Sequence, residues 1–339
     1  MGILILGVVL IPFLTSLFLK VIGKFLNELL TNFITLNAAM LSVATSFFLF
    51  GYIFFDKFKP LKFELFQWFP NPEMNFEFYL DGLSGVMMVL ICGLSLVIQL
   101  FSTSYMSKDE NYTKYFEYFN FFVFSMLLLV LSGNFLVMFF GWELVGLSSY
   151  LLISFWSEKK SAARAGNKAF ILNRIGDFGF LIGLMMIISE FQTFNFLSIF
   201  ESTLETKPEN LDVMIVFLLL GAFGKSAQFP LFSWLPDAME GPTPASALIH
   251  AATMVTAGVF MLVRISPILQ FSELSSLIII SMGLLTALIA AFAAINQKDI
   301  KKVLAYSTIS QLGFMFIAIG SGAYLSLIHI SEPTRQRVI

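Results

Sequence analysis

The chain has 339 residues, of which 58% are hydrophobic and only 12% are charged. Soluble domains carry about 25% charged residues, so this composition excludes an ordinary soluble fold and places most of the chain in a lipid bilayer. The formal net charge of −2 gives no indication of a nucleic-acid partner. The single cysteine, Cys92, excludes an internal disulfide and a metal site built on thiolates.

Apolar runs along the chain predict an all-α, polytopic bundle. A helix that crosses the hydrocarbon core needs about 20 apolar residues, and on this scale we expect about ten spans. They are predicted near residues 3–21, 33–55, 83–105, 118–131, 135–155, 168–188, from 212 to an interruption at 228–230, 245–269, 274–294 and 303–321. The polar stretches 192–210 and 235–244 are expected to be loops.

The connector between the second and third spans carries a different signal. Leu61–Phe69 and Met74–Leu80 alternate between apolar and polar residues, and Pro70-Asn71-Pro72 separates them. This pattern predicts a short β-hairpin outside the membrane. Asp81 directly precedes the third span and is predicted to cap its N-terminus.

Basic residues are concentrated in the loops after spans 1, 3, 5 and 9. The positive-inside rule therefore predicts that these loops face the cytoplasm or the mitochondrial matrix. The residues concerned are Lys20, Lys24, Lys108, Lys114, Lys159, Lys160, Arg164, Lys298, Lys301 and Lys302.

Glu143 lies well inside the fifth span. An ionised side chain at mid-bilayer costs about 2.5–3.5 kcal/mol on insertion scales, so it needs a partner or a function. No polar side chain lies within one helical turn before Glu143, so we expect it to face the bundle interior and to meet a partner on another helix. It either holds helices together or titrates, and the lack of a cation on its own helix favours titration.

Lys225 lies shortly before Pro230 in the seventh span. Proline lacks an N–H and clashes with the carbonyl four residues earlier, so the helix should break just after Lys225. Exposed backbone groups at membrane depth are tolerated only where protein or water covers them, and such broken helices form ion sites in transporters. The sequence therefore predicts that Lys225 exchanges a proton, rather than extending to an interface.

Three further ionisable residues lie in predicted spans. His250 begins the eighth span and is either a satisfied core residue or a proton relay, which its closeness to the broken span favours. Metal binding is not expected there, because no second His or Cys stands at ligand spacing. Arg174 and Asp177 are three residues apart on one helix face, where they either neutralise each other or take part in the same route.

Several motifs together resemble subunit 5 of NADH–quinone oxidoreductase, respiratory complex I. They cover most of the chain up to about Gly320, and the run ALIHAATMVTAG separates the chain from the sister subunits 2 and 4. The matching segments are Tyr79–Ser84, Gly141–Tyr150, Asn173–Asp177, Gly221–Gln228, Pro236–Pro244, Ala247–Gly258 and Asn296–Gly313.

The resemblance implies an antiporter-like fold of two inverted repeats, each with a broken helix. It implies that Glu143 and Lys225 form a charge pair of the first half-channel, with Asp177, Arg174 and His250 on the proton route. It also implies neighbours: other membrane subunits of the complex, above all an adjacent antiporter-like subunit. FMN, iron–sulfur clusters and ubiquinone would belong to other subunits, and no cofactor is expected in this chain.

The family pattern predicts the organisation of the chain. Residues 1–115 would form spans 1–3 with the hairpin, 116–270 the first repeat, and 271–322 the start of a second repeat, as if the gene were truncated. Residues 323–339 include SLIHISEPTR, which resembles translated sequencing-adapter DNA, so we interpret this tail as non-native. No role is assigned to His329, Arg335 or Arg337.

Two other functions fit the same motifs. One is a subunit of an Mrp-type sodium/proton antiporter, and the other is a silent structural subunit whose buried charges only hold helices together. The 41 phenylalanines suggest an AT-rich organellar genome, which favours the mitochondrial inner membrane over a bacterial plasma membrane. The sequence does not distinguish protons from sodium ions.

Overall fold

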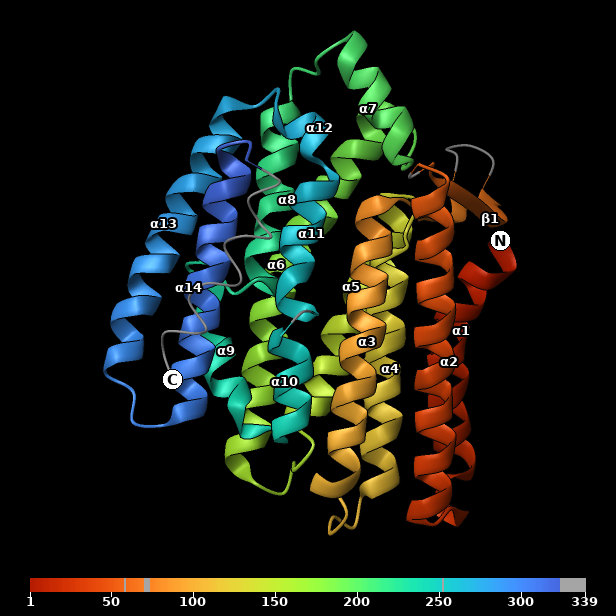
Figure 1. Ribbon diagram of the computed structural model, residues 1–339. Coiled ribbons are helices and arrows are strands. Elements are labelled where there is room, and N and C mark those ends of the chain that lie inside the picture. The colour runs from red at the N-terminus through yellow and green to blue at the C-terminus, as the bar shows by residue number, and fades with distance from the viewer. Residues whose placement is uncertain (58, 70–73, 252, 324–339) are drawn as a thin grey trace. The chain divides into compact units, whose positions relative to one another are not determined.

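The computed structural model describes residues 1–57, 59–69, 74–251 and 253–323, which form a helical protein with a β-hairpin (Figure 1). The predicted all-α, polytopic class is confirmed, since eight helices in this part are long and apolar enough to cross a membrane. The predicted Pro70-Asn71-Pro72 turn lies outside the described residues, as does the tail from residue 324 onward.

Fourteen α-helices and two strands are present in the described part. The helices are α1 Gly2–Ile22, α2 Glu28–Phe55, α3 Gly82–Tyr105, α4 Tyr112–Val130, α5 Phe135–Ile153, α6 Lys160–Phe191, α7 Phe196–Glu205, α8 Leu211–Lys225, α9 Trp234–Asp237, α10 Thr243–Ala251, α11 Ala257–Arg264, α12 Ser266–Leu269, α13 Glu273–Ile295 and α14 Ile300–Gly320. The strands are β1 Leu61–Phe69 and β2 Met74–Leu80, and the short 3-10 turns are Gly23–Phe25, Leu231–Ser233, Ala238–Glu240 and Met254–Thr256.

The chain divides into two compact units. The first comprises Met1–Ala163 with Gly241–Thr253, and the second comprises Arg164–Glu240 with the residues from Met254 onward. Helix α10 therefore belongs to the first unit and α11 to the second. These units are defined by contacts and not by internal symmetry, so the predicted repeat boundaries at residues 116–270 and 271–322 stay predictions.

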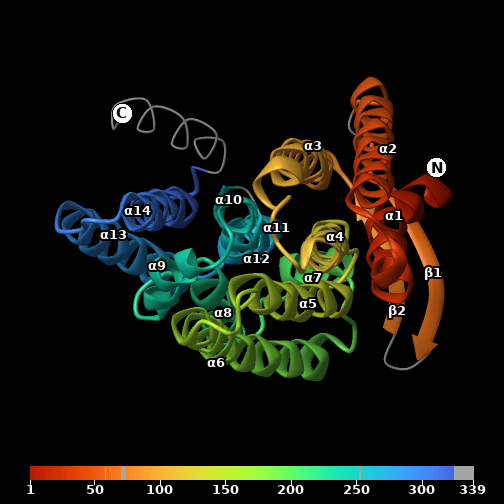
Figure 2. The ribbon, with the colours of Figure 1, turned by 90° about the horizontal axis from the view of Figure 1, so that it is seen from below.

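The first unit is a bundle of packed helices that carries the β-hairpin. Helix α1 packs against α2 and α4, α2 packs against α3, and α4 packs against α5, as Figures 1 and 2 show. The strands β1 and β2 are antiparallel, so the predicted hairpin is confirmed. It is tied to the helices by the backbone, because the Tyr79 N–H donates to the Leu131 carbonyl at 2.8 Å and the Gly133 N–H to the Glu77 carbonyl at 3.0 Å.

The predicted cap of the third span is also confirmed. The Asp81 carboxylate accepts a hydrogen bond from the Ser84 N–H at 2.9 Å. Asn134 does the same for α5, accepting from the Val137 N–H at 2.8 Å. In both places a short polar side chain satisfies a backbone donor that the first helical turn leaves free.

The second unit is held together by close backbone approaches. Helices α13 and α14 run along each other, and α8 packs against α11 (Figure 2). A Cβ on Gly283 would lie 2.7 Å from the Gly313 carbonyl oxygen, so glycine is needed where α13 meets α14. Small residues at such contacts allow membrane helices to gain dispersion energy over a long interface.

Three sequence predictions of the helices were wrong in detail. The stretch 192–210 is not only a loop, because it contains α7, whose buried residues Phe196, Ile199 and Thr203 recur at helical spacing. The eighth span is long and apolar enough to cross a membrane, as predicted, but it is not one regular α-helix, because α10 ends at Ala251 and the 3-10 turn Met254–Thr256 precedes α11. Helix α6 begins at Lys160 and not near residue 168. Its first turns contain polar and small residues, many of which favour a helix, but an apolar run does not mark them.

Candidate functional site

Lys225 and Asp177 form a buried ion pair within the second unit. The Lys225 Nζ donates to the Asp177 Oδ2 at 3.2 Å, and the two side chains are 0% and 4% exposed. Asp177 lies on α6, and Lys225 is the last residue of α8. Removing one member of such a pair leaves an uncompensated charge in the interior, which typically costs about 3–5 kcal/mol. Each of the two side chains can therefore stay charged in the interior only because the other neutralises it.

Glycines let α6 and α8 approach closely enough for this pair to form. A Cβ on Gly176 would lie 2.8 Å from the Leu220 carbonyl oxygen and 3.1 Å from the Gly224 Cα. Gly176 directly precedes Asp177 and Gly224 directly precedes Lys225. The glycines therefore bring the two backbones together one residue before each charged side chain.

Helix α8 ends at Lys225 in a Schellman motif. The Gln228 N–H donates to the Phe223 carbonyl at 2.9 Å, and the Ala227 N–H donates to the Gly224 carbonyl at 3.4 Å. Ala227 has a φ of 49°, the left-handed conformation that this motif requires at its turning residue. The motif satisfies carbonyls that the end of a helix otherwise leaves free.

The break predicted from Pro230 is confirmed, and its remaining polar groups have partners from neighbouring segments. The Trp234 indole N–H donates to the Gly224 carbonyl at 3.0 Å. The Phe229 N–H donates to the Thr286 hydroxyl on α13 at 2.9 Å. An unsatisfied backbone group at membrane depth costs several kcal/mol, so these side chains make the interruption possible.

Helix α11 covers the broken end of α8. The Ser226 hydroxyl donates to the Val255 carbonyl at 2.8 Å, just before α11 begins. A Cβ on Gly258 would lie 2.3 Å from the Ser226 Oγ and 2.6 Å from the Ala222 carbonyl oxygen. Both distances are too short for a side chain at position 258. Helix α11 therefore lies directly against Ser226, the residue that follows Lys225.

Two buried amide oxygens accompany the ion pair. Asn173 precedes Asp177 by one helical turn, and Gln228 follows Lys225 by three residues. The Asn173 amide donates to the Ala169 carbonyl and the Gln228 amide to the Ser226 carbonyl, but neither amide oxygen has a hydrogen-bond partner within the described residues. Buried oxygens of this kind usually accept from water or from another polar group.

Arg174 lies on the same face of α6 as Asp177 and is half-buried. Its guanidinium stacks on the Phe170 ring, with the Cζ 4.7 Å from the ring centroid. The sequence left open whether Arg174 and Asp177 only neutralise each other. The structure pairs the Asp177 carboxylate with Lys225 on another helix, so Asp177 does more than neutralise Arg174 on its own helix.

Glu143 lies in the first unit, in the middle of α5, and is half-buried. Close packing holds that helix, since a Cβ on Gly141 would lie 2.6 Å from the Leu129 backbone nitrogen on α4. Lys225 belongs to the other unit. The expected pairing of Glu143 with Lys225 therefore stays a prediction.

His250 also lies in the first unit, near the end of α10, which packs against α3 and α5. Its side chain is 7% exposed, and neither ring nitrogen has a hydrogen-bond partner within the described residues. A satisfied core histidine would use at least one ring nitrogen. The helix ends directly after His250, so this residue, like Lys225, stands beside an interruption.

Arg264 was missed by the sequence reasoning. It is 7% exposed at the end of α11, and its Cζ lies 5.3 Å from the centroid of the Phe260 ring. A charged residue in the apolar run from Val259 to Ile268 is a signal that could have found it. Sequence reasoning also missed the exposed ion pair between Lys168 and Asp237, with Nζ and Oδ2 2.6 Å apart.

Within the described residues no group of three or more His, Cys, Asp or Glu side chains is placed to hold a metal ion. The buried charged residues named above in the second unit are Asp177, Lys225 and Arg264, and the two cationic side chains have no lone pair to offer a metal ion while they are protonated. The expectation that the chain holds no cofactor stays a prediction.

Two family models match the chain. The model described as NADH:quinone oxidoreductase/Mrp antiporter, TM covers residues 132–331, which include Glu143, Asp177, Lys225 and His250. The model described as NADH-ubiquinone oxidoreductase (complex I), chain 5 N-terminus covers residues 68–116.

Two similar proteins and one solved structure extend this result. NADH-ubiquinone oxidoreductase chain 5 of Acanthamoeba castellanii is 44% identical, with 95% of this chain and 49% of the relative covered. NADH-quinone oxidoreductase subunit L of Neisseria meningitidis serogroup B is 41% identical, with 95% of this chain and 50% of the relative covered. A chain of the Mrp complex from a Dietzia species matches with a TM-score of 0.85 at 28% identity, covering 97% of this chain and 35% of that one. The chain thus spans about half the length of the curated relatives it matches.

Proposed function

Because the chain belongs to the NADH:quinone oxidoreductase/Mrp antiporter membrane family, we propose that it is a proton-translocating membrane subunit of an NADH:quinone oxidoreductase. The observation that carries this proposal is the buried ion pair of Lys225 with Asp177 at the broken end of α8. A protonated lysine held by a carboxylate, beside a helix interruption, is the arrangement expected of an ion-transfer site.

The pair can move a proton by separation of its charges. While Asp177 lies against Lys225, the carboxylate stabilises the ammonium form. If the carboxylate moves away or is neutralised, the ammonium is left in a low-dielectric interior, where the neutral amine is favoured. Lys225 then gives up its proton to a neighbouring acceptor. A conformational change that alternates these two states makes transfer directional.

Glu143 and His250 would extend the route. In this proposal Glu143 is a second carboxylate that alternates with Asp177 as the partner of Lys225. His250 accepts the released proton through a ring nitrogen, and this role is supported by the finding that neither nitrogen has a hydrogen-bond partner among the residues that the structure describes. Imidazole suits a relay because it binds and releases protons near neutral pH when solvated.

The energy for transport would come from elsewhere in the complex. The two curated relatives are named as chain or subunit of NADH-ubiquinone and NADH-quinone oxidoreductases. We propose that quinone reduction takes place in other subunits, which carry FMN and iron–sulfur clusters. This chain would lie beside another antiporter-like subunit in the mitochondrial inner membrane, or in the plasma membrane of a bacterium.

The second candidate is a subunit of an Mrp-type sodium/proton antiporter. It is favoured by the likeness to the Mrp complex, which extends over nearly the whole chain. The match to the chain 5 N-terminal model favours the oxidoreductase. Co-purification with NADH:quinone oxidoreductase activity separates the two, since an Mrp subunit would co-purify with sodium-dependent antiport and without NADH oxidation.

The proposed function is tested by replacing Lys225 in the complex that contains this chain. In proteoliposomes, Lys225→Ala should reduce NADH-driven acidification several-fold relative to wild type at equal amounts of assembled complex. Lys168→Ala is a matched control, because Lys168 also pairs with an aspartate but lies at the surface, 42% exposed. Normal acidification by an assembled Lys225→Ala complex would overturn the proposal and favour a structural role for the buried charges.

A further inference from the structure

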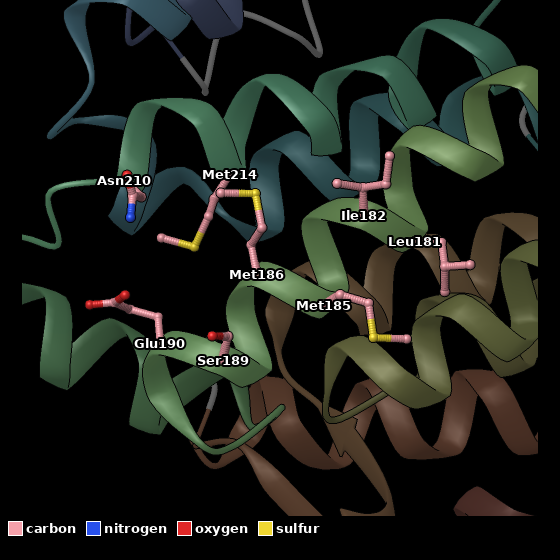
Figure 3. A pocket seen from close by; sticks show the side chains of 8 residues that line it. All are labelled: Leu181, Ile182, Met185, Met186, Ser189, Glu190, Asn210 and Met214. Carbon is pink, nitrogen blue, oxygen red and sulfur yellow. The ribbon is translucent and has the colours of Figure 1, made fainter.

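A groove with a volume of about 440 Å³ lies between the end of α6 and the beginning of α8 (Figure 3). Its size is within the roughly 300–1,000 Å³ of small-molecule sites. All of its lining residues belong to the second unit: Leu181, Ile182, Met185, Met186, Ser189, Glu190, Asn210 and Met214. The proton-transfer residues are not among them.

The groove changes from apolar to polar along its length. The α6 side chains at positions 181, 185 and 189 form one row, and those at 182, 186 and 190 form a second row. Both rows are apolar at first and end in a polar residue, Ser189 or Glu190. From position 181 to 190 the helix rises about 13 Å, so the groove is long enough for part of an extended hydrocarbon chain.

The polar end lies where the chain leaves the predicted membrane span. Helix α6 ends at Phe191, and Asn210 immediately precedes α8. Figure 3 shows Glu190, Ser189 and Asn210 gathered at one end of the groove, with Leu181 and Ile182 at the other. An amphiphile would therefore place its head group at the interface and its tail against the interior of the bilayer.

We propose that this groove binds one phospholipid through an acyl chain and a head group that carries a primary ammonium, as in phosphatidylethanolamine. Glu190 is the single charged residue among the eight that line the groove, and it is exposed. Its carboxylate attracts a cation, and the absence of Lys or Arg from the lining disfavours an anionic head group. A second acidic residue, Asp212, lies in the first turn of α8, two residues after Asn210 of the groove.

The other lining residues fit the same ligand. The Asn210 side chain makes no capping bond to α8, so its amide oxygen is available to accept from an ammonium N–H. Three of the apolar residues are Met185, Met186 and Met214, whose flexible thioethers adapt to a mobile hydrocarbon chain. A choline head group lacks N–H donors and would lose the hydrogen bonds to the carboxylate and the amide.

A photo-crosslinking experiment on the full chain tests this proposal. A photoreactive benzoylphenylalanine is introduced as Met185→benzoylphenylalanine, at a position that is 58% exposed and lines the groove. The control carries the same probe at Phe178, which is 66% exposed on the same helix but outside the groove. Both proteins are reconstituted in nanodiscs with equal amounts of phosphatidylethanolamine, phosphatidylcholine and phosphatidylglycerol, and mass spectrometry identifies the crosslinked lipid.

The expected result is enrichment of phosphatidylethanolamine at position 185 by about two- to fivefold over the other lipids, as for a partly exposed ion pair. The probe at position 178 should report the bulk composition. Adding Glu190→Gln, a conservative change at an exposed site, should remove the enrichment at position 185. Bulk composition at position 185, a preference for phosphatidylglycerol or phosphatidylcholine, crosslinks to protein alone, or enrichment that survives Glu190→Gln would each overturn the proposal.

Discussion

The two helix interruptions of this protein differ in how their polar groups are satisfied. After α8, a Schellman motif, the Trp234 indole and the Thr286 hydroxyl provide hydrogen bonds, and the charge of Lys225 is met by Asp177. After α10, the ring of His250 is buried without a hydrogen-bond partner in the described part of the chain. The first interruption thus surrounds a paired charge with hydrogen bonds, while the second buries an imidazole for which the described residues supply no partner. Four predictions follow from this difference.

The largest loss of stability is expected when only one residue of the ion pair is replaced. Lys225→Met leaves Asp177 buried without its cation and should reduce the free energy of unfolding by about 3–5 kcal/mol. Adding Asp177→Leu removes the orphaned carboxylate and should recover most of that loss, because apolar replacement of a whole buried pair is often neutral. Thermal unfolding in detergent micelles measures both variants. Equal destabilisation by the single and double variants would show that the pair is not coupled.

A smaller loss of stability is expected from a substitution that separates α11 from α8. Gly258→Ala places a Cβ against Ser226 and Ala222 and should cost about 1–3 kcal/mol through overpacking. Gly93→Ala is the matched control, because no atom lies within 4 Å of the added Cβ and alanine favours the helix by up to about 1 kcal/mol. The same unfolding assay compares them. A Gly258→Ala variant as stable as Gly93→Ala would contradict the close contact.

Removing one hydrogen bond at the α8 interruption should have an effect of similar or smaller size. Thr286→Val keeps the shape of the side chain but leaves the Phe229 N–H without its acceptor, at a cost of about 1–3 kcal/mol. Thr308→Val is a suitable control, since Thr308 is half-buried and its hydroxyl donates to the Leu304 carbonyl of its own helix. Faster amide hydrogen exchange at Phe229 in the Thr286→Val variant would support the account, and unchanged exchange and stability would refute it.

The smallest effect on stability is expected at the second interruption. His250→Gln should change the free energy of unfolding by only about 1 kcal/mol, the central value for point substitutions, because the described structure gives the ring no hydrogen bond to lose. Transport should nevertheless fall if His250 relays protons. A variant that is strongly destabilised would instead identify His250 as a structural residue.

The contrast between the interruptions also explains what the sequence could predict. Pro230 acts locally, by removing an N–H and by steric clash, so the break after Lys225 was visible in the sequence. The break after α10 contains no proline or glycine between His250 and Thr256, so no local signal of the kind that Pro230 gives marks it in the sequence. The β-hairpin and the Asp81 cap were predictable because alternation and capping are local as well.

The partners of the buried charges were harder to predict than the charges themselves. The cost of a charge in lipid singles out Glu143, Asp177 and Lys225 from the sequence alone. Which carboxylate meets Lys225 depends on the close approach of α6 to α8, which Gly176 and Gly224 permit. The role of a glycine at a helix contact depends on its neighbour, so the pairing with Asp177 became clear only from the structure.

The most direct test of the central claim measures transport by a protein that keeps its fold but lacks the ion pair. The Lys225→Met, Asp177→Leu double variant should assemble into the complex, because both members of the buried pair are replaced together and neither is left without the other. The number of protons translocated per NADH oxidised is then measured in proteoliposomes against wild type. We predict a clear reduction of this ratio in the assembled double variant. An unchanged ratio would contradict the claim that Lys225 and Asp177 carry protons.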